Sequence, residues 1–285
     1  MGMRIIGILL LTLLLSACTK LSFLAVNAGA GGAYTVEKDL PYGPEARQKL
    51  DIYTPKTGEA PHKVVVFFYG GRWEGGAKAD YKFVAADFAE RGYVVVIPDY
   101  RLYPQVKFPT FVEDGAAAVA WTIDRVALYG GDPKAINIAG HSAGAHIGSL
   151  IVSDERYLKA LNKDAHNIKS FVGLAGPYSF TPDEADLMDM FGPPANYPNM
   201  QASTFIDGRE PPMLLLYGAD DTIVKSINHE RMVKAGEAKG GNITAKIYPG
   251  LTHISILGAL SWYNPRKASV LQDMDAFFSS HDASP

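Results

Sequence analysis

A serine, an acid and a histidine occur in this chain in an order that allows nucleophilic catalysis. Ser142 lies within Gly140-His141-Ser142-Ala143-Gly144, directly after the apolar run 135–139 and before a segment with helical spacing. A serine on a sharp turn from strand to helix exposes its hydroxyl, and flanking glycines permit the close backbone approach that such a turn needs. The sequence therefore predicts Ser142 as a nucleophile.

A serine hydroxyl needs a base to react at neutral pH, and a carboxylate to orient that base. An acidic pair, Asp220 and Asp221, follows the apolar run 213–217, and His253 follows the run 245–248. The order serine, acid, histidine is the one that accompanies a serine on this kind of turn. We predict His253 as the base and one of the two aspartates as its partner.

The chain has seven histidines, so His253 has competitors. His141 and His146 flank the serine in sequence, whereas a base from a separate loop has better access to the hydroxyl. The others lie in polar surroundings or on a predicted helix face, as surface histidines do: His62, His166, His229 and His281. No histidine and acid have the spacing of an H-E-x-x-H site, and we expect no metal and no cofactor.

Two glycines supply a place for a developing oxyanion, which needs backbone N–H donors. Gly70 and Gly71 end the apolar run 64–69 and precede Trp73. Without side chains, their N–H groups can approach a substrate carbonyl closely. We predict the N–H groups of Gly70, Gly71 and Ala143 as donors. A simple tight turn is the alternative for the glycine pair, while a phosphate-binding loop is excluded because no Lys-Ser or Lys-Thr follows.

The elements that must position these residues follow from the apolar pattern. Unbroken apolar runs that end at Gly or Pro are typical of strands buried on both faces, and they occur at 64–69, 94–98, 135–140, 171–175 and 213–217. Segments with helical spacing lie between them, and residues 49–53 alternate like a half-buried strand. The pattern predicts an α/β fold with a mostly parallel central sheet and helices on both faces, which binds ligands beyond the strands' carboxyl ends.

One interval is too long for a simple connection. Residues 177–211 contain several prolines and scattered Phe, Tyr and Met side chains. Long ordered loops are more often functional than not. We interpret this interval as a small cap over the mouth of the site, with residues 191–197 lining the pocket; a surface excursion without a role is the alternative.

These motifs together resemble the carboxylesterase branch of the α/β-hydrolases, which includes hormone-sensitive-lipase-like esterases, arylformamidases and prenylcysteine methylesterases. The resemblance covers about residues 47–280 and rests on motifs in the expected order: Tyr69-Gly70-Gly71-Arg72-Trp73, Asp99-Tyr100-Arg101-Leu102, Phe108-Pro109, Asp114, Tyr129-Gly130-Gly131-Asp132-Pro133 and the segment 140–146. The branch's spacing Gly218-x-x-Asp221-x-x-Val224 favours Asp221 as the acid. Tyr69 is a departure, because most members have His before the glycine pair.

The resemblance implies an α/β-hydrolase domain over 34–285 that hydrolyses small or medium carboxylic esters through an acylated Ser142. Two alternatives remain: an arylformamidase-like amide hydrolase, and a non-catalytic envelope lipoprotein that uses the hydrolase shell for binding. The expected partner is a small-molecule ester. The net charge is −3 and the sequence has no long charged runs, so it contains no basic cluster that would indicate binding to nucleic acid.

The first residues form a different kind of sequence. Arg4 precedes the apolar stretch 5–15, which is short for a membrane-spanning helix and typical of a secretory signal. Leu15-Ser16-Ala17-Cys18 resembles the lipobox of bacterial lipoproteins and holds the only cysteine. The resemblance implies a signal peptide over 1–17, a lipidated Cys18 and a tether over 18–33; an uncleaved membrane anchor is the alternative.

A cysteine that is both diacylated and N-acylated carries enough acyl chains for stable attachment to a membrane surface. Residue 19 is Thr, so the Asp that retains the resembled lipoproteins at the inner membrane is absent. We therefore expect a lipid-anchored protein of the bacterial envelope, at the outer membrane and facing the periplasm.

Overall fold

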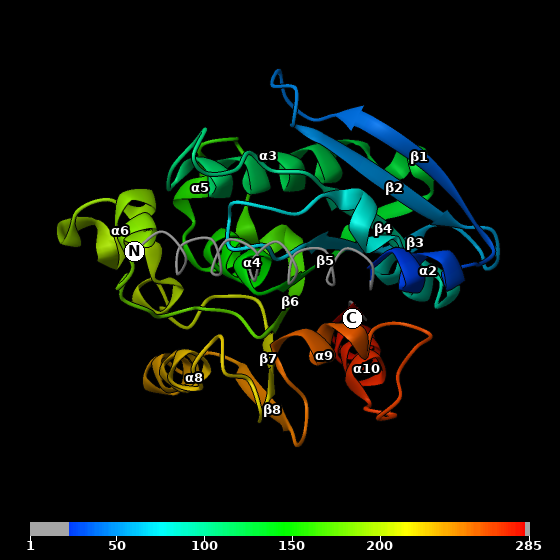
Figure 1. Ribbon diagram of the computed structural model, residues 1–285. Coiled ribbons are helices and arrows are strands. Elements are labelled where there is room, and N and C mark those ends of the chain that lie inside the picture. Colours follow the sequence, from blue (N-terminus) through cyan, green and yellow to red (C-terminus); the bar gives the residue numbers. More distant parts are fainter. Residues whose placement is uncertain (1–22, 283–285) are drawn as a thin grey trace, which may run out of the picture.

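A computed structural model of the protein describes residues 23–282, which form one central sheet with helices on both sides (Figure 1). The sheet has eight strands in the order β1-β2-β4-β3-β5-β6-β7-β8. In chain order the strands are β1 Tyr34–Pro41, β2 Lys49–Pro55, β3 His62–Phe68, β4 Val94–Pro98, β5 Gly131–His141, β6 Ile168–Leu174, β7 Met213–Gly218 and β8 Ile243–Tyr248. The predicted fold class is confirmed.

Six neighbouring strands, from β4 to β8 across the sheet, are parallel, whereas β1 and β2 pair antiparallel at one edge. Strand β1 was not expected from the sequence. Its residues are almost all exposed, so it lacks the apolar run that marks the inner strands. The carboxyl ends of the parallel strands meet at one edge of the sheet and place the predicted site residues together.

Two layers of helices cover the sheet (Figure 1). Helices α2 Lys82–Glu90 and α10 Val270–Asp282 pack together on one face through Phe88 and Phe278, whose ring centroids lie 5.9 Å apart. Helices α3 Thr110–Arg125 and α4 Ala143–Ser153 pack together on the other face, where α8 Ile227–Lys239 covers β8. The inner strands are thus buried on both sides, as their apolar runs require, whereas the edge strands β1 and β8 stay largely exposed.

The inner strands form the centre of the core. Residues 64–68 of β3 and 94–97 of β4 have no solvent exposure. Fully burying one such Val, Ile or Phe side chain contributes roughly 1.5–3 kcal/mol relative to leaving it exposed. This stable layer supports the loops at the carboxyl ends of β3, β5 and β7, which carry the candidate site.

The interval 177–211 folds into short helices next to these loops. They are α6 Ala185–Phe191, η4 Pro194–Asn196, α7 Tyr197–Met200 and η5 Ala202–Thr204. The remaining short elements are η1 Lys78–Tyr81, η2 Val126–Tyr129, α5 Arg156–Lys159, η3 Ala165–Asn167 and α9 His253–Gly258. A further helical segment covers residues 23–29. Within the part of the chain that the structure describes, no helix is both long and apolar enough to cross a membrane.

Candidate active site

Ser142 occupies the sharp turn between β5 and α4. Its backbone has φ 53° and ψ −121°, a conformation that costs a non-glycine residue free energy and is held by its surroundings. A Cβ on Gly140 would lie 2.5 Å from the carbonyl oxygen of Gly144, and one on Gly144 would collide with the carbonyl oxygen of Phe68. The expected close backbone approach at both flanking glycines is therefore present.

Asp221 and His253 come together from separate loops. The Nδ1 atom of His253 lies 2.8 Å from Oδ2 of Asp221, and both side chains are buried. The other carboxylate oxygen of Asp221 accepts hydrogen bonds from the N–H groups of Ile223 and Val224, at 2.8 and 2.9 Å. Asp220 is exposed, so the structure pairs His253 with Asp221 and not with its neighbour.

This pairing sets the charge and orientation of the two groups. Burial raises the pKa of Asp221, but the hydrogen bond and positive charge of His253 and the two N–H donors lower it by more, so its pKa lies below the usual range. Asp221 is then a carboxylate that fixes the His253 imidazole with its proton on Nδ1. No hydrogen bond joins His253 Nε2 to any residue of 23–282, Ser142 included, and such catalytic bonds often tighten only with substrate.

The glycine pair after β3 packs directly against the serine turn. A Cβ on Gly70 would lie 3.0 Å from Cβ of Ser142, and Gly71 has φ +135°. The chain then folds back, and the N–H of Gly75 donates to the carbonyl of Gly71 at 2.9 Å. Among the described residues, no acceptor binds the N–H groups of Gly70, Gly71 or Ala143, so all three predicted donors are available beside Ser142.

A cavity of about 610 Å³ opens onto Ser142. Its walls come from three places: Arg72 and Trp73 after the glycine pair, residues 177–187 of the cap interval, and residues 223–231 after Asp221. The size lies within the range of small-molecule sites. Residues 177–187, the first part of the interval 177–211, thus form one wall of this cavity.

The part of this interval that lines the cavity differs from the expectation. Phe191, predicted to line it, is buried against Trp73, with ring centroids 4.9 Å apart. Residues 191–197 instead border a separate hollow of about 770 Å³ that contains no residue of the predicted triad. Phe180 and Leu187 face the cavity at Ser142 in their place. The sequence can indicate that an apolar residue at the end of a short helix is buried. It does not show whether the side chain faces the cavity or packs behind the residues that line it.

Comparison with known proteins agrees with this geometry. Residues 50–235 match the family described as BD-FAE. The chain belongs to the BD-FAE family.

Several curated relatives of this BD-FAE chain are named as esterases. A probable isoprenylcysteine alpha-carbonyl methylesterase of Arabidopsis thaliana is 27% identical over 248 residues, covering 78% of this chain and 51% of the relative. Esterase LipC of Mycobacterium tuberculosis is 27% identical over 211 residues, covering 67% of this chain and 52% of the relative. The chain thus spans about half the length of the curated relatives it matches.

Solved structures share the fold over nearly the whole chain. Esterase B from Lactobacillus rhamnosis superimposes with a TM-score of 0.81 and 21% identity, covering 97% of this chain and 95% of that one. At this identity the likeness concerns the fold. It agrees with the α/β-hydrolase class predicted from the strand order and the serine turn.

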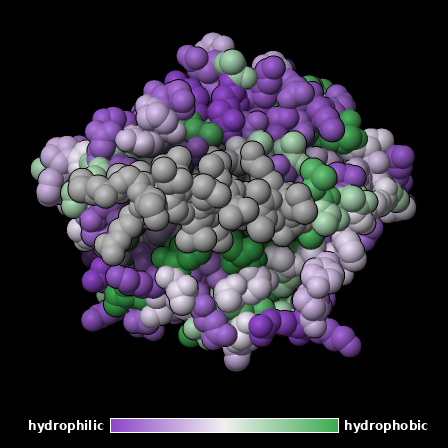
Figure 2. Space-filling view, viewed as in Figure 1, coloured by the Kyte–Doolittle hydropathy of each residue, from purple (hydrophilic) through white to green (hydrophobic). Residues whose placement is uncertain are grey.

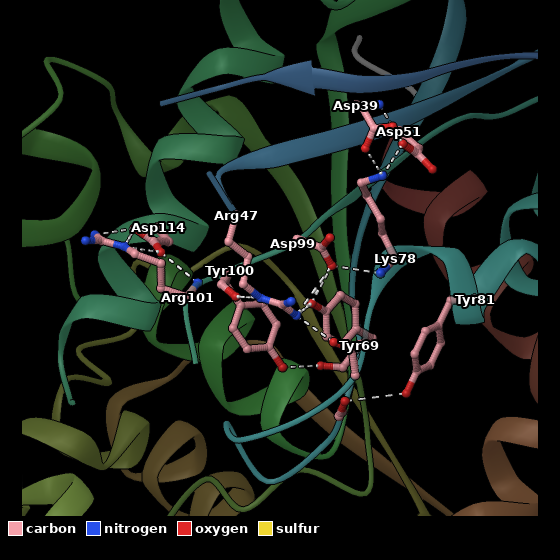
Figure 3. Close-up of polar contacts among 12 residues, drawn as sticks. Asp39, Arg47, Asp51, Tyr69, Lys78, Tyr81, Asp99, Tyr100, Arg101 and Asp114 are labelled. Atoms are coloured by element: carbon pink, nitrogen blue, oxygen red, sulfur yellow. Dashed lines mark hydrogen bonds and ion pairs between the residues drawn. The ribbon is translucent and has the colours of Figure 1, made fainter. Parts of the chain in front are cut away.

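Tyr69, the departure from the branch's usual histidine, is buried and belongs to a polar network with the partly buried Arg47 and Asp99 in this BD-FAE domain (Figure 3). Its hydroxyl donates to Oδ1 of Asp99 at 2.6 Å and accepts from Nη2 of Arg47 at 2.8 Å. Burial, then Tyr100 and Asp99, raise the pKa of Tyr69 well above its usual value, so the phenol keeps its proton. The network fixes the residue that immediately precedes Gly70.

Neighbouring aromatic residues complete this support. The ring of Tyr69 stacks between those of Tyr81 and Tyr100, with centroids 5.2 and 4.8 Å away. The Tyr100 hydroxyl donates to the Tyr69 carbonyl at 2.8 Å, and the Tyr81 hydroxyl donates to the Gly70 carbonyl at 3.5 Å (Figure 3). Arg47 and Tyr81 could not be recognised from the sequence, because neither lies in a motif and both reach the site only through the fold.

The two histidines next to the serine are buried, neutral supports. Burial, then the charge of His253, lowers the pKa of His141 to about 3, and burial lowers that of His146 to about 4. Since a carbonyl only accepts, His141 Nε2 donates to the carbonyl of His253 at 2.9 Å, and His146 Nε2 donates to that of Met200 at 2.7 Å. His141 therefore holds the backbone of the predicted base, and His146 ties α4 to the cap interval.

Two other histidine predictions were wrong. His62 and His229, expected at the surface, are 9% and 6% exposed. His229 lies against Tyr217 of β7 with ring centroids 4.6 Å apart. Neither belongs to the site. No cluster of three or more potential metal ligands occurs among residues 23–282.

Proposed function

We propose that this chain is a serine carboxylesterase that hydrolyses small or medium carboxylic esters through an acyl-enzyme. The observation that carries the proposal is the combination of a strained Ser142, the 2.8 Å bond between Asp221 and His253, and unbonded N–H groups beside the serine. Membership of the BD-FAE family and relatives named as esterases support it.

In the first step Ser142 Oγ attacks the ester carbonyl while its proton passes to Nε2 of His253. Asp221 stabilises the imidazolium and keeps its own charge. The N–H groups of Gly70, Gly71 and Ala143 bind the tetrahedral oxyanion. Collapse of this intermediate expels the alcohol, which takes the proton from His253.

In the second step water attacks the acyl group on Ser142, and His253 accepts a proton from that water. The second tetrahedral intermediate collapses, releases the carboxylic acid and returns the proton to Ser142. The 610 Å³ cavity, closed on one side by residues 177–187, supports small or medium substrates.

The experiment is an assay of the purified mature protein against p-nitrophenyl esters of increasing acyl length, beside Ser142→Ala. We expect hydrolysis that depends on Ser142 and decreases beyond medium chains. N-formyl aryl substrates in the same assay test the formamidase alternative. Serine-independent hydrolysis, or none on either class, would contradict the proposal and favour a binding role.

We also propose that Cys18 is lipidated and anchors the chain in a bacterial envelope, at the outer membrane on its periplasmic side. The support is the sequence Leu15-Ser16-Ala17-Cys18, which lies outside the described residues. Mass spectrometry of the N-terminal peptide tests it, and fractionation of the two membranes tests its place. An unmodified Cys18 would remove the anchor without affecting the esterase proposal.

A further inference from the structure

The predicted tether is not loose where the structure describes it. Within the helical segment 23–29, the amide of Asn27 donates to the carbonyl of Asp80 at 2.8 Å and accepts from the N–H of Phe83 at 2.9 Å. The ring of Phe23 packs on that of Tyr81 at 5.1 Å. The segment is therefore fixed to the domain, and only residues 19–22 separate it from Cys18.

The outward face of this segment is apolar. Its exposed residues are Leu24, Ala25, Ala28 and Gly29, and Leu24 is 74% exposed. Asn27, the one polar residue of 23–29, is turned inward and bonded. A helix on a protein surface usually directs polar side chains outward. An outward face without any polar side chain points to an apolar neighbour.

A second element continues this surface. Trp262 and Tyr263, in the loop after α9, are each 58% exposed, with ring centroids 5.8 Å apart. The indole Nε1 of Trp262 donates to the carbonyl of Val26 at 2.9 Å, so the loop lies against the segment 23–29. Arg266 and Lys267 are exposed in the same loop. Exposed Trp and Tyr beside basic side chains are the composition that favours the headgroup region of an anionic bilayer.

The anchor limits how far this surface can be from lipid. An extended chain advances at most about 3.6 Å per residue, so Phe23 lies within about 18 Å of Cys18. If Cys18 is lipidated, the segment 23–29 starts close to the membrane surface. Figure 2 shows hydrophobic surface near the centre of this view and a mostly hydrophilic rim above it.

We propose that the anchor-side face, formed by residues 23–29 and 262–267, lies against the surface of the lipid bilayer. The proposal rests on the lipid anchor at Cys18 and goes beyond the esterase activity. Trp262, Tyr263 and Leu24 enter the headgroup region, and Arg266 and Lys267 face its anionic lipids.

This orientation places two supports of the candidate active site near the membrane. The loop with Trp262 directly follows α9, whose first residue is His253 and whose next residue, Ile254, is 50% exposed. On the other side, Phe23 contacts Tyr81, and Tyr81 stacks on Tyr69 next to the glycine pair. The anchor-side face therefore adjoins the helix that begins at the base and the aromatic residues that support the oxyanion loop. The cavity at Ser142 lies beyond these supports, because its walls come from other segments.

The test uses the three tryptophans of the chain as depth probes. Trp73 is buried, Trp121 is half-buried on α3, and Trp262 is exposed on the proposed face. The full mature lipoprotein is reconstituted into vesicles of phosphatidylethanolamine and phosphatidylglycerol, with or without lipids brominated near the headgroup. Variants Trp262→Phe and Trp121→Phe are measured in parallel.

We expect the brominated lipids to quench the wild-type emission, Trp262→Phe to remove this quenching, and Trp121→Phe to retain it. Vesicles without phosphatidylglycerol should give weaker quenching because Arg266 and Lys267 lose their anionic partners.

Equal quenching in wild type and Trp262→Phe, or none in wild type with a lipidated Cys18, would overturn the proposed face and leave the anchor intact. A Trp262-dependent dimer in detergent, with no quenching in vesicles, would assign the face to a second copy instead. Ester hydrolysis in the same samples reports the esterase proposal separately.

Discussion

The hydroxyl of Tyr69 donates to Oδ1 of Asp99 across 2.6 Å, at the end of the strand that carries the glycine pair. The same carboxylate oxygen accepts the backbone N–H of Lys78 at 2.8 Å, so Asp99 connects the two sides of the loop between β3 and η1. The position of the Gly70 and Gly71 donors thus depends on a phenol that touches no substrate.

The variant Tyr69→Phe tests this positioning role. It keeps the stacked ring and removes the bonds to Asp99 and Arg47. We expect kcat for a p-nitrophenyl ester to fall by roughly tenfold with KM nearly unchanged. The displaced donors then bind the oxyanion of the transition state less well, while binding of the uncharged substrate hardly changes. Steady-state kinetics and circular dichroism provide the measurement.

A matched control removes a similar bond elsewhere. Tyr93 donates to Asp275 at 2.8 Å, away from the glycine pair. Tyr93→Phe should therefore lower stability in the same way as Tyr69→Phe but leave kcat unchanged. An equal loss of kcat in both variants would show that Tyr69 acts through general stability alone.

Asp221 and Asp220 offer a comparison between adjacent acids. Asp221→Asn keeps the shape but favours the wrong His253 tautomer, and we expect kcat to fall on the order of 10⁴-fold. Asp220→Asn changes an exposed carboxylate and should leave kcat within a factor of about two. Initial rates with one short-chain ester decide the matter, and a large loss in Asp220→Asn would contradict the assignment of the acid.

The contrast between these residues shows what the sequence could predict. Ser142 and Asp221 follow the apolar runs of buried parallel strands, and His253 follows the parallel edge strand β8. The carboxyl ends of such strands meet. Their proximity therefore follows from periodicity and chain order. Strand β1 was missed because an exposed edge strand has no apolar run.

The network around Tyr69 could not be predicted for a different reason. Arg47 and Asp99 are 52 positions apart and meet at 3.7 Å only because β2 pairs with β4. His229 was misplaced because its burial depends on how α8 sits on β7, and its own segment is mostly polar. Both cases depend on packing between elements, which local sequence patterns do not contain.

The buried neutral histidines predict how stability depends on pH. The folded pKa values of His141, about 3, and His146, about 4, lie below their ordinary value of 6.5. As the pH falls below 6.5, the unfolded chain binds protons that the folded chain does not. The contribution of each histidine to the free energy of unfolding is thus complete above pH 6.5 and decreases as the pH falls toward the folded pKa. The total loss is about 1.4 kcal/mol for each unit by which the folded pKa lies below the ordinary value.

Urea unfolding between pH 7.5 and pH 4.5 measures this decrease. In His146→Gln the amide can still donate to the Met200 carbonyl, but the side chain no longer titrates. We expect the free energy of unfolding to fall less steeply with decreasing pH in this variant than in wild type. Parallel curves for the two proteins would show that His146 does not titrate as its burial requires.

Arg72 connects the oxyanion loop to the cap interval. Its Nη2 atom lies 2.7 Å from Oε2 of Glu184 and 2.8 Å from Oδ2 of Asp186. All three side chains are partly exposed, so the pairs are worth little in stability, but they fix one wall of the cavity. In Arg72→Gln we expect KM for the longer esters to change by roughly two- to fivefold, with kcat for the shortest ester unchanged. Arg209→Gln, which breaks an exposed pair with Asp207, is the control and should alter neither.

The backbone of Ser142 predicts an unusual order of stabilities. Replacing a residue by glycine normally makes a protein less stable than replacing it by alanine, by about 1 kcal/mol within a helix. At φ 53° and ψ −121° a Cβ is strained, whereas glycine is not. We therefore expect Ser142→Gly to unfold at higher urea concentration than Ser142→Ala, although both are inactive.

Ser149 provides the matched pair in the same helix. It lies inside α4, and its hydroxyl donates to the His146 carbonyl at 2.8 Å. Both replacements remove this bond, but there the helical backbone favours alanine, so Ser149→Gly should be the less stable variant. Opposite orders at the two serines would locate the strain at Ser142. If the glycine variant is less stable than the alanine variant at both positions, the turn holds Ser142 without appreciable backbone strain.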